Sequence, residues 1–184
     1  MPTNGYAVLT VPGYTSSGPS HWQTLWERAD PAQFRRVEQR DWEKPDPQQW
    51  VDTLLAAIDS TPESKLILVG HSLGALTIAQ AAPRIDDRRV RGALLVAPCD
   101  VEQQDTLAVL RPFAPMPIEP LPWRSILVAS SDDPYLSLDR ARQFARVWNA
   151  RLEILEGAGH INTASGHGPF HAGERLLREL VGSP

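Results

Sequence analysis

The sequence contains a single cysteine, Cys99, among its 184 residues. One thiol excludes an internal disulfide, and so few cysteines are typical of proteins that work in a reducing compartment. Most lone cysteines are buried and inert, so we expect Cys99 to be a structural thiol rather than a reactive one.

Long apolar segments and runs of like charge are also missing. No segment approaches the roughly 18 apolar residues of a membrane span, and the first residues lack the basic and apolar regions of a signal peptide. The 18 basic and 22 acidic residues are dispersed and give a formal net charge of −4. The sequence therefore disfavours nucleic acid and membrane as partners. It predicts a cytoplasmic protein with a small ligand that is uncharged or nearly so.

What the sequence does contain is an alternation of short apolar strands with helical patterns. Strands are expected at residues 6–11, 34–39, 65–69, 90–97, 125–130 and 151–155, and helices at 19–29, 48–58, 75–82, 101–110, 138–149 and 170–181. This alternation predicts the α/β class, with a doubly wound parallel sheet and helices on both faces. The length suits a single domain over residues 1–184.

Residues 112–122 interrupt the alternation with five prolines. So many missing N–H donors exclude both helix and sheet. The stretch lies between two predicted strands, where a crossover could wall a ligand pocket at the carboxyl edge of the sheet. The alternative is a stiff connector with its apolar residues docked on the core, and both interpretations stay open.

The most informative stretch is Gly70-His71-Ser72-Leu73-Gly74, which follows a buried apolar strand and precedes a helical pattern. Gly-x-Ser-x-Gly in this context predicts a nucleophile elbow, a tight turn that holds the serine in a strained conformation. Leu73 N–H would then point at the oxyanion of the reaction from the start of the helix. The motif alone is weak, and an ordinary glycine-rich turn is the alternative.

A nucleophilic serine needs a base, and His160 is the candidate. It lies in a glycine-containing loop after the last predicted strand, from which its ring could reach Ser72. The other histidines are His21, His71, His167 and His171. His71 precedes the nucleophile and is expected to point away from it. His167 and His171 are spaced like metal ligands, but Pro169 between them and the lack of a third ligand disfavour a metal.

The base needs an orienting acid, and two adjacent aspartates follow the fifth predicted strand. Asp132 and Asp133 cannot be separated by pattern alone. Pro134 restricts Asp133 to extended backbone, which favours Asp133 as the acid. Asp132 remains the alternative, and its other interpretation is to stabilise the turn.

The loop after the first strand, Pro12-Gly13-Tyr14, should open beside the elbow. In hydrolases of this architecture, the corresponding loop supplies a second N–H to the oxyanion. We therefore expect the backbone N–H groups of Tyr14 and Leu73 to form the oxyanion hole.

Taken together, these motifs resemble the α/β-hydrolase superfamily, and more narrowly the small retinoblastoma-binding protein 9 family with its bacterial YdeN-like relatives. The matching segments are residues 11–14, 21–26, 41–42 with Pro45 and Trp50, 70–74, 131–135, and 159–162 with 165–166. The resemblance implies a minimal fold without a cap domain and with strand order 2-1-3-4-5-6. It also implies a triad of Ser72, Asp133 and His160, and no cofactor. It strengthens the choice of Asp133, because the family's catalytic aspartate directly precedes a proline.

These observations predict a serine hydrolase that cleaves small carboxylic esters through an acyl-enzyme intermediate. Only 61 positions separate Ser72 from Asp133. No cap fits there, and the pocket should be shallow and suited to a short acyl group. An amidase acting on small aminoacyl substrates is a second interpretation, and a non-catalytic protein-binding module on the same fold is a third. The chain is expected to be a monomer or small homo-oligomer, with a small acyl substrate as its partner and neither metal nor cofactor.

Overall fold

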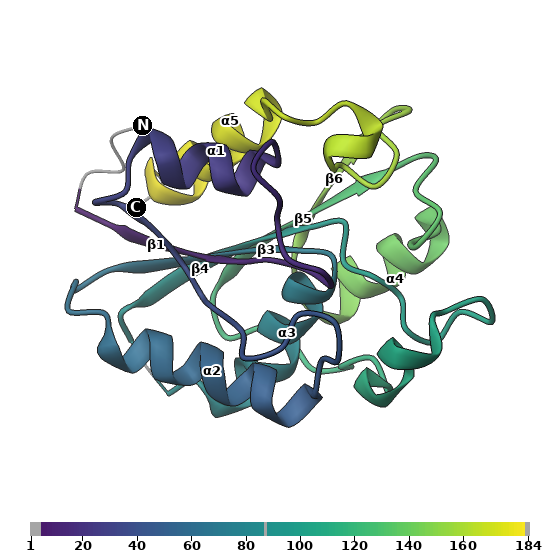
Figure 1. The fold of residues 1–184 in the computed structure, drawn as a ribbon, viewed down its shortest axis with the longest axis horizontal. Helices are drawn as coiled ribbons and strands as arrows, with labels where there is room; N and C mark the ends of the chain where they lie inside the picture. The colour runs from purple at the N-terminus through teal and green to yellow at the C-terminus, as the bar shows by residue number, and fades with distance from the viewer. Residues whose placement is uncertain (1–4, 87, 183–184) are drawn as a thin grey trace.

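A parallel sheet forms the centre of the computed structural model, which describes residues 5–86 and 88–182 (Figure 1). The strands found in these residues are β1 (Ala7–Val11), β2 (Phe34–Arg36), β3 (Leu66–His71), β4 (Val90–Val96), β5 (Arg124–Ser130) and β6 (Arg151–Leu155). Their order in the sheet is β2-β1-β3-β4-β5-β6, and every pairing is parallel. This confirms the predicted α/β class and strand order.

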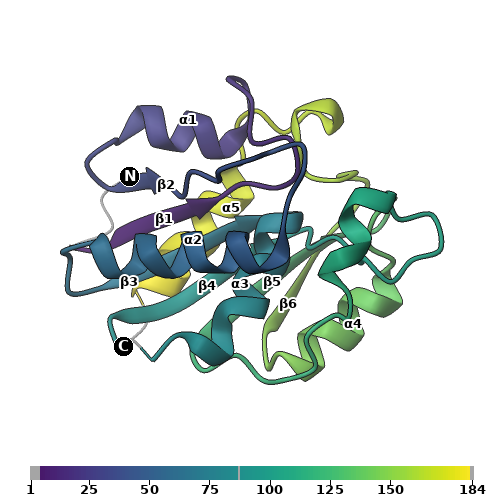
Figure 2. The same cartoon turned by 60° about the horizontal axis from the view of Figure 1, so that its bottom comes forward.

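Helices cover both faces of the sheet, as Figures 1 and 2 show. One face packs against α1 (Trp22–Ala29) and α5 (His171–Gly182). The other packs against α2 (Pro47–Ser60), α3 (Leu73–Ala81) and α4 (Leu138–Val147). Side chains alternate along β3. Ile67 and Val69 pack on the face covered by α1 and α5, and Leu66 and Leu68 pack on the face covered by α2, α3 and α4. A strand buried on both faces therefore reads as a continuous apolar run.

Polar caps explain where several helices begin. The α1 helix was predicted to start at residue 19, but it starts at Trp22. The reason is that His21 Nδ1 accepts a hydrogen bond from Gln23 N. The α2 helix starts at Pro47, and Asp46 accepts from Gln49 N. A cap that satisfies a free N–H of the first turn sets the helix start more strongly than propensity does.

The predicted amphipathic helix at residues 101–110 is wrong. Tight turns occupy residues 101–105, and a 3-10 helix follows at Ala108–Phe113. The side chain of Asp100 accepts from Glu102 N, and Thr106 Oγ1 donates to the Asp100 carbonyl. Short polar side chains that bind nearby backbone in this way compete with an α-helix. The 3-10 helix includes Pro112, so the exclusion of all helix from residues 112–122 is also wrong at the start of that stretch.

The rest of the proline-rich stretch is docked on the core. Phe113, Met116 and Leu121 are buried, and Trp148 Nε1 donates to the Pro117 carbonyl at 2.8 Å. These contacts support the connector interpretation.

Because the strands are parallel, their carboxyl ends meet at one edge of the sheet, and the loops that follow them lie together there. The edge strand β2 is shorter than the predicted 34–39. In the described part of the chain, no helix is long and apolar enough to cross a membrane.

Candidate active site

Ser72 stands at a strained turn between β3 and α3. Its φ and ψ are 54° and −122°, a conformation that L-residues rarely adopt. Two glycines make the turn possible. A Cβ on Gly70 would lie 2.6 Å from Ala75 N, and one on Gly74 would lie 2.0 Å from the Val11 carbonyl oxygen. No side chain fits at either position, so the local geometry is that of the predicted elbow, with Ser72 at the first turn of α3.

A chain of hydrogen bonds joins the three residues predicted to form a triad. His160 Nε2 lies 2.9 Å from Ser72 Oγ, and His160 Nδ1 lies 3.0 Å from each carboxylate oxygen of Asp133. The Asp133 side chain is fully buried, whereas Ser72 is partly exposed. With Asp133 ionised, Nδ1 carries the proton and Nε2 is free to accept one from Ser72. The structure thus brings together residues from the ends of three strands.

The neighbouring aspartate makes different contacts. Asp132 Oδ1 accepts from Ser130 Oγ and from Gly159 N, both at 2.7 Å. These hydrogen bonds hold the pKa of the Asp132 carboxyl below its usual range. The interaction with Gly159 ties the end of β5 to the loop that carries His160. Asp132 is therefore placed to stabilise the turn, and it does not contact the His160 ring.

Two buried side chains hold the backbone of the His160 loop, and sequence reasoning assigned neither of them this role. His71 Nε2 donates to the His160 carbonyl at 2.9 Å, and Trp22 Nε1 donates to the Ile161 carbonyl, also at 2.9 Å. Ile161 has a φ of 50°, which is strained for a β-branched residue. These bonds hold the loop in that conformation. The His71 side chain thus binds the main chain of His160, and this contact cannot be seen in sequence spacing because 89 positions separate the two residues.

A row of imidazole rings extends inward from His160. The His71 ring lies 4.9 Å from that of His160, and the His21 ring lies 4.8 Å from that of His71. Burial, with smaller contributions from the charges of Arg36 and His160, lowers the pKa of His21 to about 4. Burial also lowers the pKa of His71 well below its ordinary value. Both rings are therefore neutral near neutral pH and add no positive charge beside His160.

The loop after β1 lies against the elbow, as expected. A Cβ on Gly13 would come within 2.9 Å of Ser72 Cβ. The buried Gln23, which sequence reasoning also left without a role, donates to the carbonyls of Val11 and Val69 and so joins the end of β1, where this loop begins, to β3. Tyr14 lines the same cavity as Ser72, and Leu73 is the first residue of α3. The assignment of their N–H groups to an oxyanion hole stays a prediction.

A small cavity opens above Ser72. Its volume is about 210 Å³, and its lining is Tyr14, Thr15, Ser72, Cys99, Leu107, Leu110, Tyr135, His160 and Asn162. None of these residues belongs to the proline-rich stretch 112–122. Cys99 is buried, and burial raises the pKa of its thiol to about 12. This agrees with an inert thiol, because the thiolate is the reactive form.

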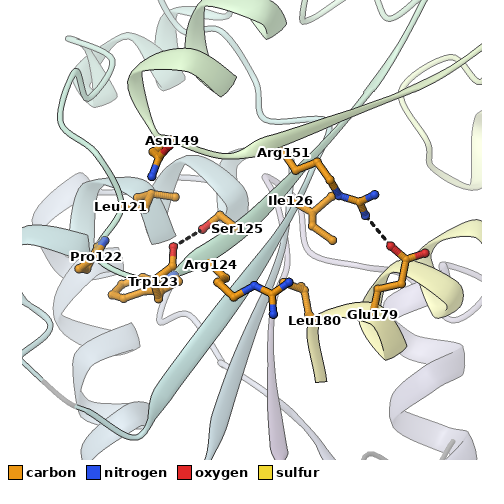
Figure 3. A pocket seen from close by; sticks show the side chains of 10 residues that line it. All are labelled: Leu121, Pro122, Trp123, Arg124, Ser125, Ile126, Asn149, Arg151, Glu179 and Leu180. Atoms are coloured by element: carbon orange, nitrogen blue, oxygen red, sulfur yellow. Dashed lines mark hydrogen bonds and ion pairs between the residues drawn. The ribbon is translucent and has the colours of Figure 1, made fainter. Parts of the chain in front are cut away.

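A larger cavity of about 580 Å³ lies at the opposite edge of the sheet, where β5 and β6 begin (Figure 3). It contains none of the predicted site residues, and the Arg151 and Glu179 side chains in its lining are paired with each other. Size alone is therefore a poor guide to the site. Among residues 5–86 and 88–182, no cluster of three or more His, Cys, Asp or Glu side chains could hold a metal.

The fold and the residues gathered at the carboxyl edge of the sheet define a class of protein, and comparison with known families identifies it. The chain belongs to the serine hydrolase family, whose model matches residues 8–179. It is therefore a hydrolase. No curated protein sequence matches the chain.

Within this family the chain is similar to YdeN-like hydrolases. A protein from Pectobacterium atrosepticum described as a YdeN-like hydrolase is 31% identical, with a TM-score of 0.83 over 97% of this chain and 92% of that one. The ydeN gene product of Bacillus subtilis is 18% identical, with a TM-score of 0.77 over 97% of this chain and 100% of that one. The carboxylesterase CesB of Bacillus subtilis shares the fold, at 15% identity and a TM-score of 0.65 over 100% and 86% of the two chains.

Proposed function

We propose that the protein hydrolyses small carboxylic esters through an acyl-enzyme intermediate formed on Ser72. The observation that carries the proposal is the unbroken hydrogen-bond chain from Ser72 through His160 to the buried Asp133. A histidine held in this way is a general base for the hydroxyl, and the carboxylate stabilises the imidazolium that forms. This is the arrangement that activates a serine, and a purely binding protein has no need of it.

In the first step, Ser72 Oγ attacks the ester carbonyl while His160 Nε2 takes its proton. The negative charge that develops on the carbonyl oxygen is stabilised by the N–H groups of Leu73 and Tyr14, with help from the α3 dipole. His160 then gives the proton to the departing alcohol, which leaves the acyl group on Ser72. Water, deprotonated by His160, then attacks the ester on Ser72, and His160 returns the proton to Ser72 Oγ as the acid leaves.

Two further observations bear on the substrate. The cavity of about 210 Å³ at Ser72 is small, which suits a short acyl group. The structurally similar CesB is a carboxylesterase, although a shared fold at 15% identity is only an analogy for function. The preference for esters is tested by comparing the turnover of an ethyl ester and an ethyl amide of the same acid. Turnover of the amide at or above the rate of the ester would refute it.

Covalent labelling by a fluorophosphonate probe tests the mechanism. The native protein should carry one adduct on Ser72, located by mass spectrometry of its peptides. Ser72→Ala and His160→Ala should both abolish labelling, because the first removes the nucleophile and the second its base. Ser64→Ala, at an exposed serine far from the site, is the matched control and should label like the native protein. A folded native protein that fails to react would instead support a binding module.

A further inference from the structure

A second cavity adjoins the one at Ser72. Its volume is about 270 Å³, and four residues line both cavities, namely Cys99, Leu107, Leu110 and Tyr135. We refer to the side of the site made by these four together with Val101 and Pro134 as the apolar arm. A group bonded to Ser72 Oγ can therefore extend past Cys99 into the apolar arm.

Two side chains of the apolar arm offer hydrophobic surface that nothing in the described chain covers. Cys99, Val101 and Leu110 are buried around it, while Leu107 and Tyr135 are 51% and 50% exposed. Large apolar side chains so exposed beside a cavity are typical of a ligand-binding groove. Covering them with an aliphatic chain removes apolar surface from water, at about fourfold in affinity for each buried methylene.

Charge beside the apolar arm selects against an anionic ligand. The carboxylate of Asp100 is occupied by Arg140, whose Nε and Nη2 lie 2.6 and 3.0 Å from its two oxygens. Asp100 is therefore not free to bind a cationic group. Asp105 lies exposed in the lining and would repel a chain that carries a carboxylate of its own. An anionic chain is therefore disfavoured, and the apolar side chains of the arm favour an aliphatic one.

The walls of the apolar arm are joined to each other through Asp100. Its N–H donates to the Tyr135 carbonyl at 2.9 Å, and its own carbonyl accepts from Thr106 Oγ1. The turn that leads to Leu107 and the loop that carries Tyr135 are thus held together before any ligand binds. A preformed pocket loses little free energy to ordering when it is filled.

We propose that the apolar arm binds the acyl chain of the substrate and selects short, uncharged aliphatic acyl groups. The inference rests on the proposed function. The acyl group stays on Ser72, beside Cys99, through both steps. The alcohol must instead receive its proton at His160 and leave, past the polar Thr15 and Asn162 that also line the cavity. A volume of about 270 Å³ lies below the usual range of drug-sized pockets, roughly 300–1,000 Å³, which favours short chains over long lipids.

Hydrolysis of two ester series tests this assignment. In the first, the acid varies from acetate through butyrate to hexanoate with ethanol as the constant alcohol. In the second, the alcohol varies from ethyl through butyl to hexyl with acetate as the constant acid. The native protein should show kcat/KM rising at least tenfold from ethyl acetate to ethyl hexanoate, because four more methylenes enter the apolar arm. The alcohol series should change much less.

Variants at Leu107 test whether the dependence of kcat/KM on acyl chain length arises in the apolar arm. Because the Leu107 side chain is exposed, these variants should still fold. Leu107→Glu places a charge in the apolar arm and should lower the hexanoate-to-acetate ratio of kcat/KM about tenfold, while Leu107→Ala should lower it less. Ile118→Glu is the matched control, since Ile118 is 76% exposed but lines neither cavity, and its ratio should equal that of the native protein.

Three outcomes would overturn the inference. The first is a kcat/KM that does not change along the acyl series in the native protein. The second is a chain-length effect on kcat/KM confined to the alcohol series. The third is a higher kcat/KM for an aminoacyl ester with a free ammonium group than for ethyl butyrate. Fluorophosphonate labelling of the same samples separates these results from failure of the proposed function. A labelled Ser72 with a flat acyl series refutes only the role of the apolar arm, whereas an unlabelled protein refutes the serine mechanism itself.

Discussion

Asp132 and Asp133 are neighbours in the chain but face different groups. The Asp133 carboxylate is buried against the His160 ring, while Asp132 binds Ser130 and the backbone of Gly159. Pro134 is the sequence signal that favours Asp133, through its effect on the backbone of the preceding residue. The difference makes this pair a sensitive test of the triad, because equivalent substitutions at adjacent positions should have unequal consequences.

Asp133→Asn should lower kcat by about 10⁴-fold, because an amide no longer holds the His160 ring in the tautomer that accepts the serine proton. Asp132→Asn removes an exposed charge that does not contact the ring, and kcat should stay within about threefold. Steady-state hydrolysis of ethyl butyrate at pH 8 measures both variants, and circular dichroism checks their folds. If Asp132→Asn proves the more damaging of the two, the acid has been assigned to the wrong residue.

Individual residues differ in how far the sequence reveals them. Ser72, Asp133 and His160 can be selected because each follows a predicted strand at the carboxyl edge. His71 and Gln23 cannot, because their contacts are with backbone carbonyls of distant segments. The expectation that His71 would point away from the nucleophile left out its bond to the main chain of His160. No local pattern encodes a hydrogen bond of that kind.

At the scale of elements, the sequence-based prediction is wrong in the segment from β4 to the 3-10 helix Ala108–Phe113. Apolar spacing predicted a helix over 101–110, but Asp100 and Thr106 bind nearby backbone and produce turns instead. Asp100 also joins this segment to α4 through Arg140. The central strands β1, β3, β4 and β5, by contrast, were predictable because burial on both faces leaves a continuous apolar run.

Removing Arg140 should destabilise the fold by about 3 kcal/mol, because the Asp100 carboxylate, whose side chain is only 2% exposed, loses its charged partner. Urea unfolding of Arg140→Ala measures the change. Arg142→Ala is the matched control on the same helix. Its pair with Asp139 is exposed, and the free energy of unfolding should change by less than about 0.5 kcal/mol. Equal changes in the free energy of unfolding would mean that the buried Asp100–Arg140 pair stabilises the fold no more than an exposed ion pair does.

At the scale of the whole molecule, the buried histidines couple stability to pH. The unfolded His21 side chain binds a proton below its ordinary pKa of 6.5, whereas in the folded protein its pKa is about 4. Between these values the unfolded state binds more protons, so stability is complete above pH 6.5 and is lost as pH falls through this window. His71, whose pKa is also lowered, acts in the same direction.

The free energy of unfolding should therefore fall by about 2 kcal/mol from pH 7 to pH 5 through His21 alone. Urea denaturation at a series of pH values gives the slope. His21→Asn keeps a side chain that can cap α1, but it has no group that titrates in this range, so its slope should be shallower by that amount. An unchanged slope in the variant would mean that His21 does not remain neutral in the folded protein.

The architecture of the whole molecule was the most predictable property. Alternating strands and helices imply a doubly wound sheet, and the resemblance to a known family supplied the strand order. A shallow pocket at the site was predicted, but the walls of the second cavity were not, since they come from the segment that folds as turns and from the exposed side chains of Leu107 and Tyr135. Side-chain positions of that kind depend on tertiary contacts rather than on periodicity.

The bonds that assemble the site join distant parts of the chain. Ser72 and His160 are 88 positions apart, and Trp22 reaches across 139 positions to the Ile161 carbonyl. Contacts of such long range form late, because they need the intervening sheet to be in place. Under the proposed mechanism, the reactivity of Ser72 is therefore a reporter of refolding. Catalysis should return only when both ends of the chain have closed on the centre, and a fragment that stops short of β6 should not regain it.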